Sequence, residues 1–257
     1  MKLAWHPFIF DVPPTWEVIR HRNNPDEGQL HLADRHGEQM QIFWKRMKEA
    51  PAIAARLAEL AGGGPRRRIV EHHGWQVSFG PPTFAARYDD TILLTLVFPL
   101  VATAPVRAIL ESYRPNHGPE RHWAAFGLDC VLPAEFHPTE VKAMPALQVM
   151  HFENSRNESV TIHRYGMLAL ILGADDLATF FARTKGPRTQ LRRTGTFRQA
   201  GKYPGVELSY RSRSGKLWGR GREGHVWIWQ CDEFQRLYCL DQCGEPIRDL
   251  VEKVHCQ

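Results

Sequence analysis

Basic and aromatic side chains alternate in one stretch of the chain, in a pattern that suits binding to a polyanion. Residues 183–223 hold twelve Lys and Arg but only two acids, Glu207 and Glu223, so this stretch carries +10 and the remainder carries −5. Cationic side chains pair with phosphate groups, and aromatic rings between them can stack on bases. The side chains expected to contact an anion or another ligand are Arg192, Arg193, Arg213, Lys216, Trp218, Arg220 and Arg222. A solvated basic strand edge is the alternative interpretation, and we favour it over nucleic-acid binding because the whole chain carries only +5.

Cysteine and histidine residues do not follow a known metal-binding spacing. The five cysteines, an odd number in a long chain, fit reduced thiols better than a disulfide scaffold. Cys239 and Cys243, together with Cys231 and the His255-Cys256 pair, offer enough ligands for one zinc, but their spacing is not that of a zinc finger. His72 and His73 are adjacent in an expected strand, where neighbouring side chains point to opposite faces. We therefore expect no metal site and no cofactor.

Motifs for catalysis are missing from the sequence. It contains no P-loop, no dinucleotide-binding glycine pattern, no nucleophile elbow and no zinc-protease motif. No catalytic residue is assigned on this basis. The sequence favours a protein that is not an enzyme.

Several segments of the chain occur twice in the same order, which indicates an internal duplication. PVRAILESY at residues 105–113 returns as PIRDLVEKV at residues 246–254, and each copy has apolar residues at helical spacing. A hairpin pattern recurs with an offset of 120 residues, so that His31 corresponds to His151 and Ile42 to Ile162. By alternation, both histidines are expected to point away from their apolar neighbours, as surface or inter-domain residues.

Each copy reads as a strand, a hairpin, a helix, several strands and a closing helix. The expected domains are residues 1–117 and 121–257, joined by a short polar linker that is rich in Pro and Gly. We expect Ile109, Leu110, Leu250 and Val251 to be buried, because they lie at the centres of the two closing helices. The second copy carries a Gly- and Arg-rich insertion at residues 211–224, which the first replaces with Gly80-Pro81-Pro82. Since the fold can omit this insertion, it is a candidate for contact with another molecule.

The chain resembles the PsbP-like superfamily in three segments. These are the opening FDVPPTW, a hairpin led by GQLHL and the closing AILESYRP. Phe10, Pro14 and Trp16 carry the opening motif, and Ser112-Tyr113-Arg114 the end of the closing helix. The resemblance implies an α+β fold in which helices sandwich an antiparallel sheet, a three-layer α/β/α arrangement repeated twice. Members of this superfamily are mostly binding or assembly modules without a shared active site.

The composition of the chain is that of a globular protein without a membrane-spanning segment. The chain is 43% hydrophobic and 24% charged, as in ordinary globular proteins, and no apolar run approaches the ~20 residues that span a bilayer. Polar residues and prolines break the N-terminal apolar patch, so we expect a cytoplasmic protein without an export signal. The favoured function is a non-enzymatic binding or assembly module for an unknown protein or anionic ligand. A polyanion binder acting through residues 183–223, and a metal-dependent or hydrolytic enzyme at the cleft between the domains, are the alternatives.

Overall fold

The computed structural model describes residues 1–22, 24, 26–60, 68–186, 189–212, 222–247 and 249–256. The chain divides into two compact units. Unit 1 comprises Met1–Gly118 and His122–Ala125, and unit 2 comprises Pro119–Arg121 and Phe126–Gln257. None of the described helices is both long enough and apolar enough to cross a membrane.

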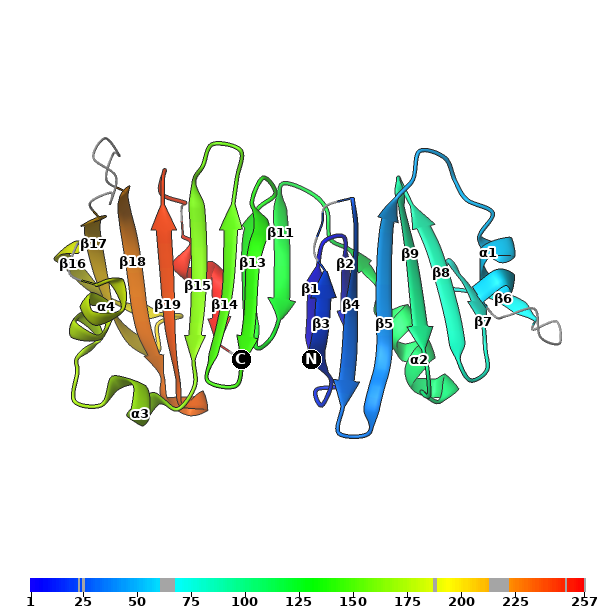
Figure 1. The fold of residues 1–257 in the computed structure, drawn as a ribbon, viewed down its shortest axis with the longest axis horizontal. Helices are drawn as coiled ribbons and strands as arrows, with labels where there is room; N and C mark the ends of the chain where they lie inside the picture. Colours follow the sequence, from blue (N-terminus) through cyan, green and yellow to red (C-terminus); the bar gives the residue numbers. More distant parts are fainter. Residues whose placement is uncertain are drawn as a thin grey trace. The chain divides into compact units, whose positions relative to one another are not determined.

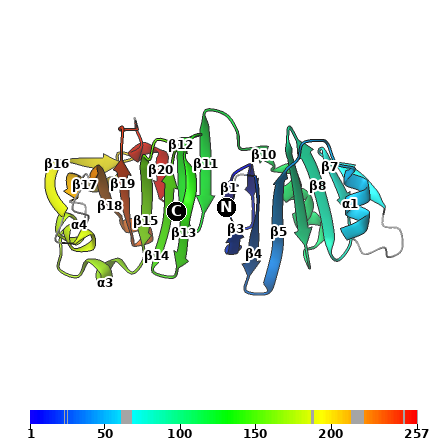
Figure 2. The ribbon, with the colours of Figure 1, turned by 45° about the horizontal axis from the view of Figure 1, so that its top comes forward.

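Unit 1 is built around a seven-stranded antiparallel sheet with the order β3-β4-β5-β9-β8-β7-β6 (Figure 1). Its strands are β3 (Glu17–Arg22), β4 (Glu27–Asp34), β5 (Gly37–Arg46), β6 (Ile69–His72), β7 (Trp75–Ser78), β8 (Thr83–Asp89) and β9 (Ile92–Phe98). Helix α1 (Ile53–Leu60) lies beside β7 and β8 (Figure 2). Its buried Leu57 packs with Phe84, Ala86 and Leu93 on one face of the sheet. This amphipathic contact fixes the helix, because a helix of eight residues has little stability alone.

The other face of this sheet is covered mainly by strands. The elements involved are β1 (Lys2–Trp5), β2 (Phe8–Asp11), α2 (Thr103–Glu111), β10 (Arg114–Pro115) and the unit 1 part of β11 (Glu120–Ala125). Phe8 packs on Trp44 with ring centroids 5.9 Å apart, and Phe10 packs on Trp75 at 6.0 Å. The period-two pattern of the opening segment therefore buries aromatic rings against the sheet, and this burial supplies much of the core of unit 1.

Unit 2 contains a second seven-stranded antiparallel sheet, with the order β13-β14-β15-β19-β18-β17-β16 (Figures 1 and 2). Its strands are β13 (His137–Met144), β14 (Leu147–Glu153), β15 (Ser159–Tyr165), β16 (Thr189–Gln199), β17 (Tyr203–Ser212), β18 (Arg222–Cys231) and β19 (Arg236–Cys243). The remaining elements are β12 (Leu128–Pro133), α3 (Leu168–Leu172), α4 (Leu177–Lys185), the 3₁₀ turns η1 (Asp232–Phe234) and η2 (Val251–Lys253), and β20 (Val254–Cys256).

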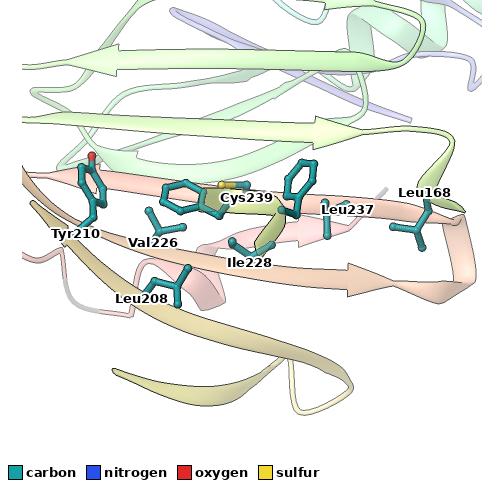
Figure 3. Packing of buried hydrophobic residues seen from close by; sticks show 9 residues of the cluster. Leu168, Leu208, Tyr210, Val226, Ile228, Leu237 and Cys239 are labelled. Carbon is teal, nitrogen blue, oxygen red and sulfur yellow. The ribbon is translucent and has the colours of Figure 1, made fainter. Parts of the chain in front are cut away.

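One face of this sheet packs against α3 and α4. Leu208, Val226, Ile228 and Leu237 belong to a buried cluster that is drawn in Figure 3 and also includes Phe180 and Phe181 of α4. Asp176 caps α4, since its carboxylate accepts a hydrogen bond from the Thr179 backbone N–H at 2.7 Å. The cap fixes the start of α4, and Gly186, with φ +78°, ends the helix directly after Lys185.

The two seven-stranded sheets have the same strand order, which is the outcome that an internal duplication predicts. The register agrees as well. In β4 and β5, Leu30 pairs with Ile42, and in β14 and β15, Met150 pairs with Ile162. Each of these residues lies 120 positions from its counterpart, so the offset read from the sequence is also an offset between paired backbone positions.

The expected three-layer α/β/α fold class is wrong. Strands make up 56% of the structure and helices 16%, so the chain is predominantly antiparallel β rather than α+β. Described α-helices reach nine residues at most, too few to cover a face of a seven-stranded sheet. In unit 1, strands β1 and β2 of the opening segment lie on a face of the sheet that the resemblance assigned to helices.

The closing helix expected at residues 246–254 is also wrong. Among the described residues of this segment, the 3₁₀ turn η2 is the helical element, and Val254 begins β20, which pairs with β12. Strand pairing satisfies the backbone of this segment and so replaces the helix. Burial is confirmed for Ile109, Leu110 and Leu250, which are at most 2% exposed, whereas Val251 is only partly buried.

Candidate functional site

The basic residues singled out in the sequence are only partly placed by the structure. Arg213, Lys216, Trp218 and Arg220 lie outside the described residues. Arg192 is exposed on β16, where it pairs with Ser209 of β17. The backbones of Arg193 and Arg222 pair with Leu208 and Ser212. The structure thus brings β16, β17 and β18 together as one basic sheet region, but it does not assemble the predicted side chains into a defined site.

A polar pocket of about 440 Å³ lies in unit 2 over the α4-covered face of the sheet. Strands β13, β14, β15 and β19 form its floor, and the end of α4 forms one wall. The residues that line it are Glu140, Lys142, Leu147, Val149, His151, Thr161, His163, Tyr165, Phe181, Thr184, Lys185, Cys239 and Asp241. Most of these side chains are polar or ionisable, and Leu147, Val149 and Phe181 supply apolar surface.

Asp241 anchors a buried polar network at one side of the pocket. The Lys185 ammonium pairs with Asp241 Oδ2, and the Tyr210 hydroxyl donates to Asp241 Oδ1 at 2.8 Å. Lys185 also lies over the Tyr210 ring, with Nζ 4.9 Å from its centroid. A buried carboxylate is tolerated only when such partners compensate the loss of water. The network therefore holds the last residue of α4 in one position at the edge of the pocket.

His163 presents an unpartnered nitrogen within the pocket. It lies on β15 between Val149 of β14 and Cys239 of β19, and its ring stacks on Tyr165 with centroids 5.8 Å apart. Its Nδ1 is shielded from solvent and has no hydrogen-bond partner among the described residues. The pKa of His163 is lowered to about 4, mainly by burial; Asp241 opposes this shift, and nearby Lys185 adds to it. The imidazole is therefore neutral at pH 7 and can donate or accept one hydrogen bond according to its tautomer.

Hydrogen bonds and burial constrain other side chains around His163. His151 Nδ1 lies 2.7 Å from Thr161 Oγ1, and its Nε2 lies 3.1 Å from Glu153 Oε1. Burial raises the pKa of the Cys239 thiol and of the Tyr165 phenol, so both groups are protonated at neutral pH. A protonated, buried thiol is a poor nucleophile.

The corresponding place in unit 1 lacks these polar groups. The pairing of β5 with β9 puts Phe43 opposite Thr95 and Gln41 opposite Val97. The pairing of β15 with β19 puts His163 opposite Cys239 and Thr161 opposite Asp241. Unit 1 also has a hollow here, of about 350 Å³, lined by Phe43, Thr95 and Val97 among others. His163 and Asp241 therefore replace Phe43 and Val97, and the shared fold does not require them.

No family model matches this chain, and no curated protein is significantly similar to it. The function is consequently argued from the chemistry of the pocket and not from relatives.

Reasoning from the sequence missed this pocket. His151 was expected to be a surface or inter-domain residue, but it lies at the rim of the pocket with its ring partly buried. A usable signal was present in the 120-residue offset, which aligns Phe43 with His163. An ionisable residue that replaces an aromatic one in a second copy of the same strand marks a position where packing alone does not determine the residue type. Asp241 carried no such signal, because insertions change the offset before β19.

Proposed function

We propose that the chain is a non-enzymatic binding module whose ligand site is the pocket of unit 2. The observation that carries this proposal is the shielded, unpartnered Nδ1 of His163 within a pocket of suitable size. A buried polar atom without a partner costs free energy, and a ligand toward which the imidazole rotates would recover that cost by hydrogen-bonding to Nδ1.

The pocket favours a small ligand without net charge. Lys185 is paired with Asp241, and Lys142 is paired with Glu140 at 2.6 Å, so neither cation is left to balance an anion. The phenol ring of Tyr165 and the Phe181 ring offer apolar surface next to His163. A planar molecule that carries an amide or a similar neutral polar group would stack on these rings and hydrogen-bond to Nδ1.

Binding is favoured over catalysis by the states of the ionisable groups. The Cys239 thiol and the Tyr165 phenol are protonated because burial raises their pKa values. His163, with its pKa lowered to about 4, is a weak base at neutral pH. The pocket therefore holds hydrogen-bonding groups in fixed forms, which suits recognition better than proton transfer.

NMR spectroscopy of the histidine rings tests this function. The protein, labelled with ¹⁵N at its histidine rings, is titrated with benzamide as the neutral planar probe and with benzoate as its charged analogue. We expect benzamide to shift the His163 signals more strongly than benzoate does. His163→Phe, which introduces the residue found at the same place in unit 1, should abolish saturable benzamide binding. His36→Gln, at an exposed hairpin tip of unit 1, is the control and should bind as the parent does. A His163 signal that neither probe shifts would contradict the proposal.

A further inference from the structure

His72, His73 and Glu111 of unit 1 bring two imidazoles and a carboxylate together. His72 is the last residue of β6, and Glu111 is the last residue of α2. His73 begins the turn to β7 and has a left-handed backbone, with φ +51°. In an extended strand, adjacent side chains would point to opposite faces. The turn removes this restriction, so the expectation that these two side chains point to opposite faces is wrong.

The distances within this cluster suit a metal ion. The Nε2 atom of His72 lies 3.2 Å from Glu111 Oε1, and Nε2 of His73 lies 3.6 Å from the same oxygen. Tetrahedral zinc has bonds of about 2.0–2.2 Å to nitrogen and oxygen, which places neighbouring ligand atoms about 3.4 Å apart. One ligand atom from each of the three residues fits within a group 4.8 Å wide.

His72 offers a nitrogen that the protein leaves without a hydrogen bond. Its Nε2 is shielded from solvent and, within the part of the chain that the structure describes, has no partner in hydrogen-bonding geometry, although the Glu111 carboxylate is close. Glu111 lies at the C-terminus of α2, where the helix dipole disfavours a negative charge. The last turn of α2 contains no basic residue that would offset this effect. A cation bound between these groups would satisfy the nitrogen and the carboxylate together.

Unit 2 shows which part of this arrangement the fold itself requires. Gln199 ends β16 as His72 ends β6, and its Nε2 donates to the Val254 carbonyl at 2.6 Å, next to η2. A link between this strand end and the closing segment therefore needs only one polar side chain. Ala200, with φ +50°, takes the place of His73 in the turn. The second imidazole of unit 1 is unnecessary for such a link, which points to a further role.

We propose that His72, His73 and Glu111 bind a divalent transition-metal ion of the zinc class, with water completing its coordination. Two imidazole nitrogens and one carboxylate oxygen are ligands that this class of ion prefers. The site is independent of the pocket in unit 2, and its test does not depend on the proposed function.

Calorimetry with Zn²⁺ and absorption spectroscopy with Co²⁺ test this site on untagged, chelator-treated protein. We expect one ion per chain and Co²⁺ bands in the visible region without the near-ultraviolet thiolate band that cysteine ligation would give. His73→Asn should weaken Zn²⁺ binding by about tenfold or more. Even the loss of a residue that only hydrogen-bonds to a metal ligand lowers metal affinity by about tenfold. Asn tolerates the left-handed conformation and so keeps the turn.

Two further variants separate metal binding from a structural link. His72→Gln copies Gln199 and should retain the folded state but lose Zn²⁺ affinity, whereas His36→Gln should bind as the parent does. A Zn²⁺-induced rise in melting temperature should disappear in His73→Asn while the far-ultraviolet circular dichroism stays unchanged. Three outcomes would each overturn the proposal: no Zn²⁺ binding in the parent, Zn²⁺ affinity as high as the parent's in His73→Asn and His72→Gln, or a Co²⁺ thiolate band.

Discussion

Phe43 and His163 occupy the same position in the two sheets of this protein. Phe43 pairs with Gln29 on one side and Thr95 on the other, and His163 pairs with Val149 and Cys239 in the same way. One fold position thus holds an aromatic ring in unit 1 and a partly buried imidazole in unit 2. Both units have a flat ring in this place, and unit 2 adds hydrogen-bonding capacity to it.

His163 should make the stability of the protein depend on pH between about 6.5 and about 4. Burial lowers its pKa from 6.5 to about 4, so in this range the unfolded chain binds a proton that the folded chain does not. Stability should therefore fall as the pH drops from 6.5 towards 4, and this contribution should be constant above 6.5. In His163→Phe the slope in this range should be smaller than in the parent. Urea unfolding at pH 4.5, 5.5 and 7 measures it, and parallel curves for the two proteins would contradict the assignment.

Removal of Lys185 should destabilise unit 2 through Asp241. The Asp241 side chain is only 7% exposed and would keep the Tyr210 hydroxyl as its hydrogen-bond donor, while Lys185 itself is 30% exposed. We expect Lys185→Met to cost about 1–3 kcal/mol, less than the full loss for a completely buried pair because solvent screens the lysine. In a double-mutant cycle with Asp241→Asn, the two effects should be clearly non-additive. Additive effects would mean that the pair contributes nothing.

Leu110 and Leu250 should each contribute strongly to stability despite their different local structures. Leu110 is 1% exposed on α2, and Leu250 is 2% exposed just before η2. Substitution of either by Ala should cost about 2–5 kcal/mol, through lost burial and the cavity left behind. Leu170, which is 76% exposed on α3, is the control, and Leu170→Ala should change stability little. Thermal and denaturant unfolding check this expectation, and an unchanged Leu250→Ala protein would refute the burial of that segment.

Gly224 should be intolerant of a side chain. A Cβ at this position would lie 2.6 Å from the Tyr210 ring and 2.7 Å from the Gln242 carbonyl oxygen. Gly224→Ala should therefore destabilise the protein by about 1–3 kcal/mol and displace Tyr210 from Asp241. Gly195→Ala is the matched control on β16, because its Cβ would meet only the Glu207 side chain at 3.5 Å. Equal melting temperatures for the two variants would contradict this packing.

Polyanion binding by the basic region, residues 183–223, remains a prediction. Arg192 is exposed on β16, and Arg211 donates to Glu223 at 2.7 Å, so part of the local charge is already paired. If the insertion contacts a polyanion, reversal of charge at Arg213, Arg220 and Arg222 should abolish retention on heparin at low salt. Retention that survives this triple change, or a parent protein that heparin does not retain, would remove the hypothesis.

The sequence determined the local elements of this protein and their repetition. Period-two alternation predicted the hairpins, and the 120-residue offset between them equals the offset of paired residues such as Ile42 and Ile162. Burial of Ile109, Leu110 and Leu250 followed from apolar spacing. These features depend on residues close in sequence, because side-chain period and turn chemistry are local properties. The resemblance supplied a helical layer that does not form, and helical apolar spacing supplied a closing helix at residues 246–254 where a 3₁₀ turn and a strand lie.

Only the tertiary structure decided where chemistry is concentrated. Thr161 faces Asp241 because β15 pairs with β19, and no local pattern states which distant strands become neighbours. Lys185 reaches Asp241 only because the apolar face of α4 packs on this sheet. His72 and His73 share a carboxylate because a left-handed turn residue changes the direction of the second imidazole. In each case, backbone pairing and packing brought together side chains that are far apart in the sequence or were expected to diverge.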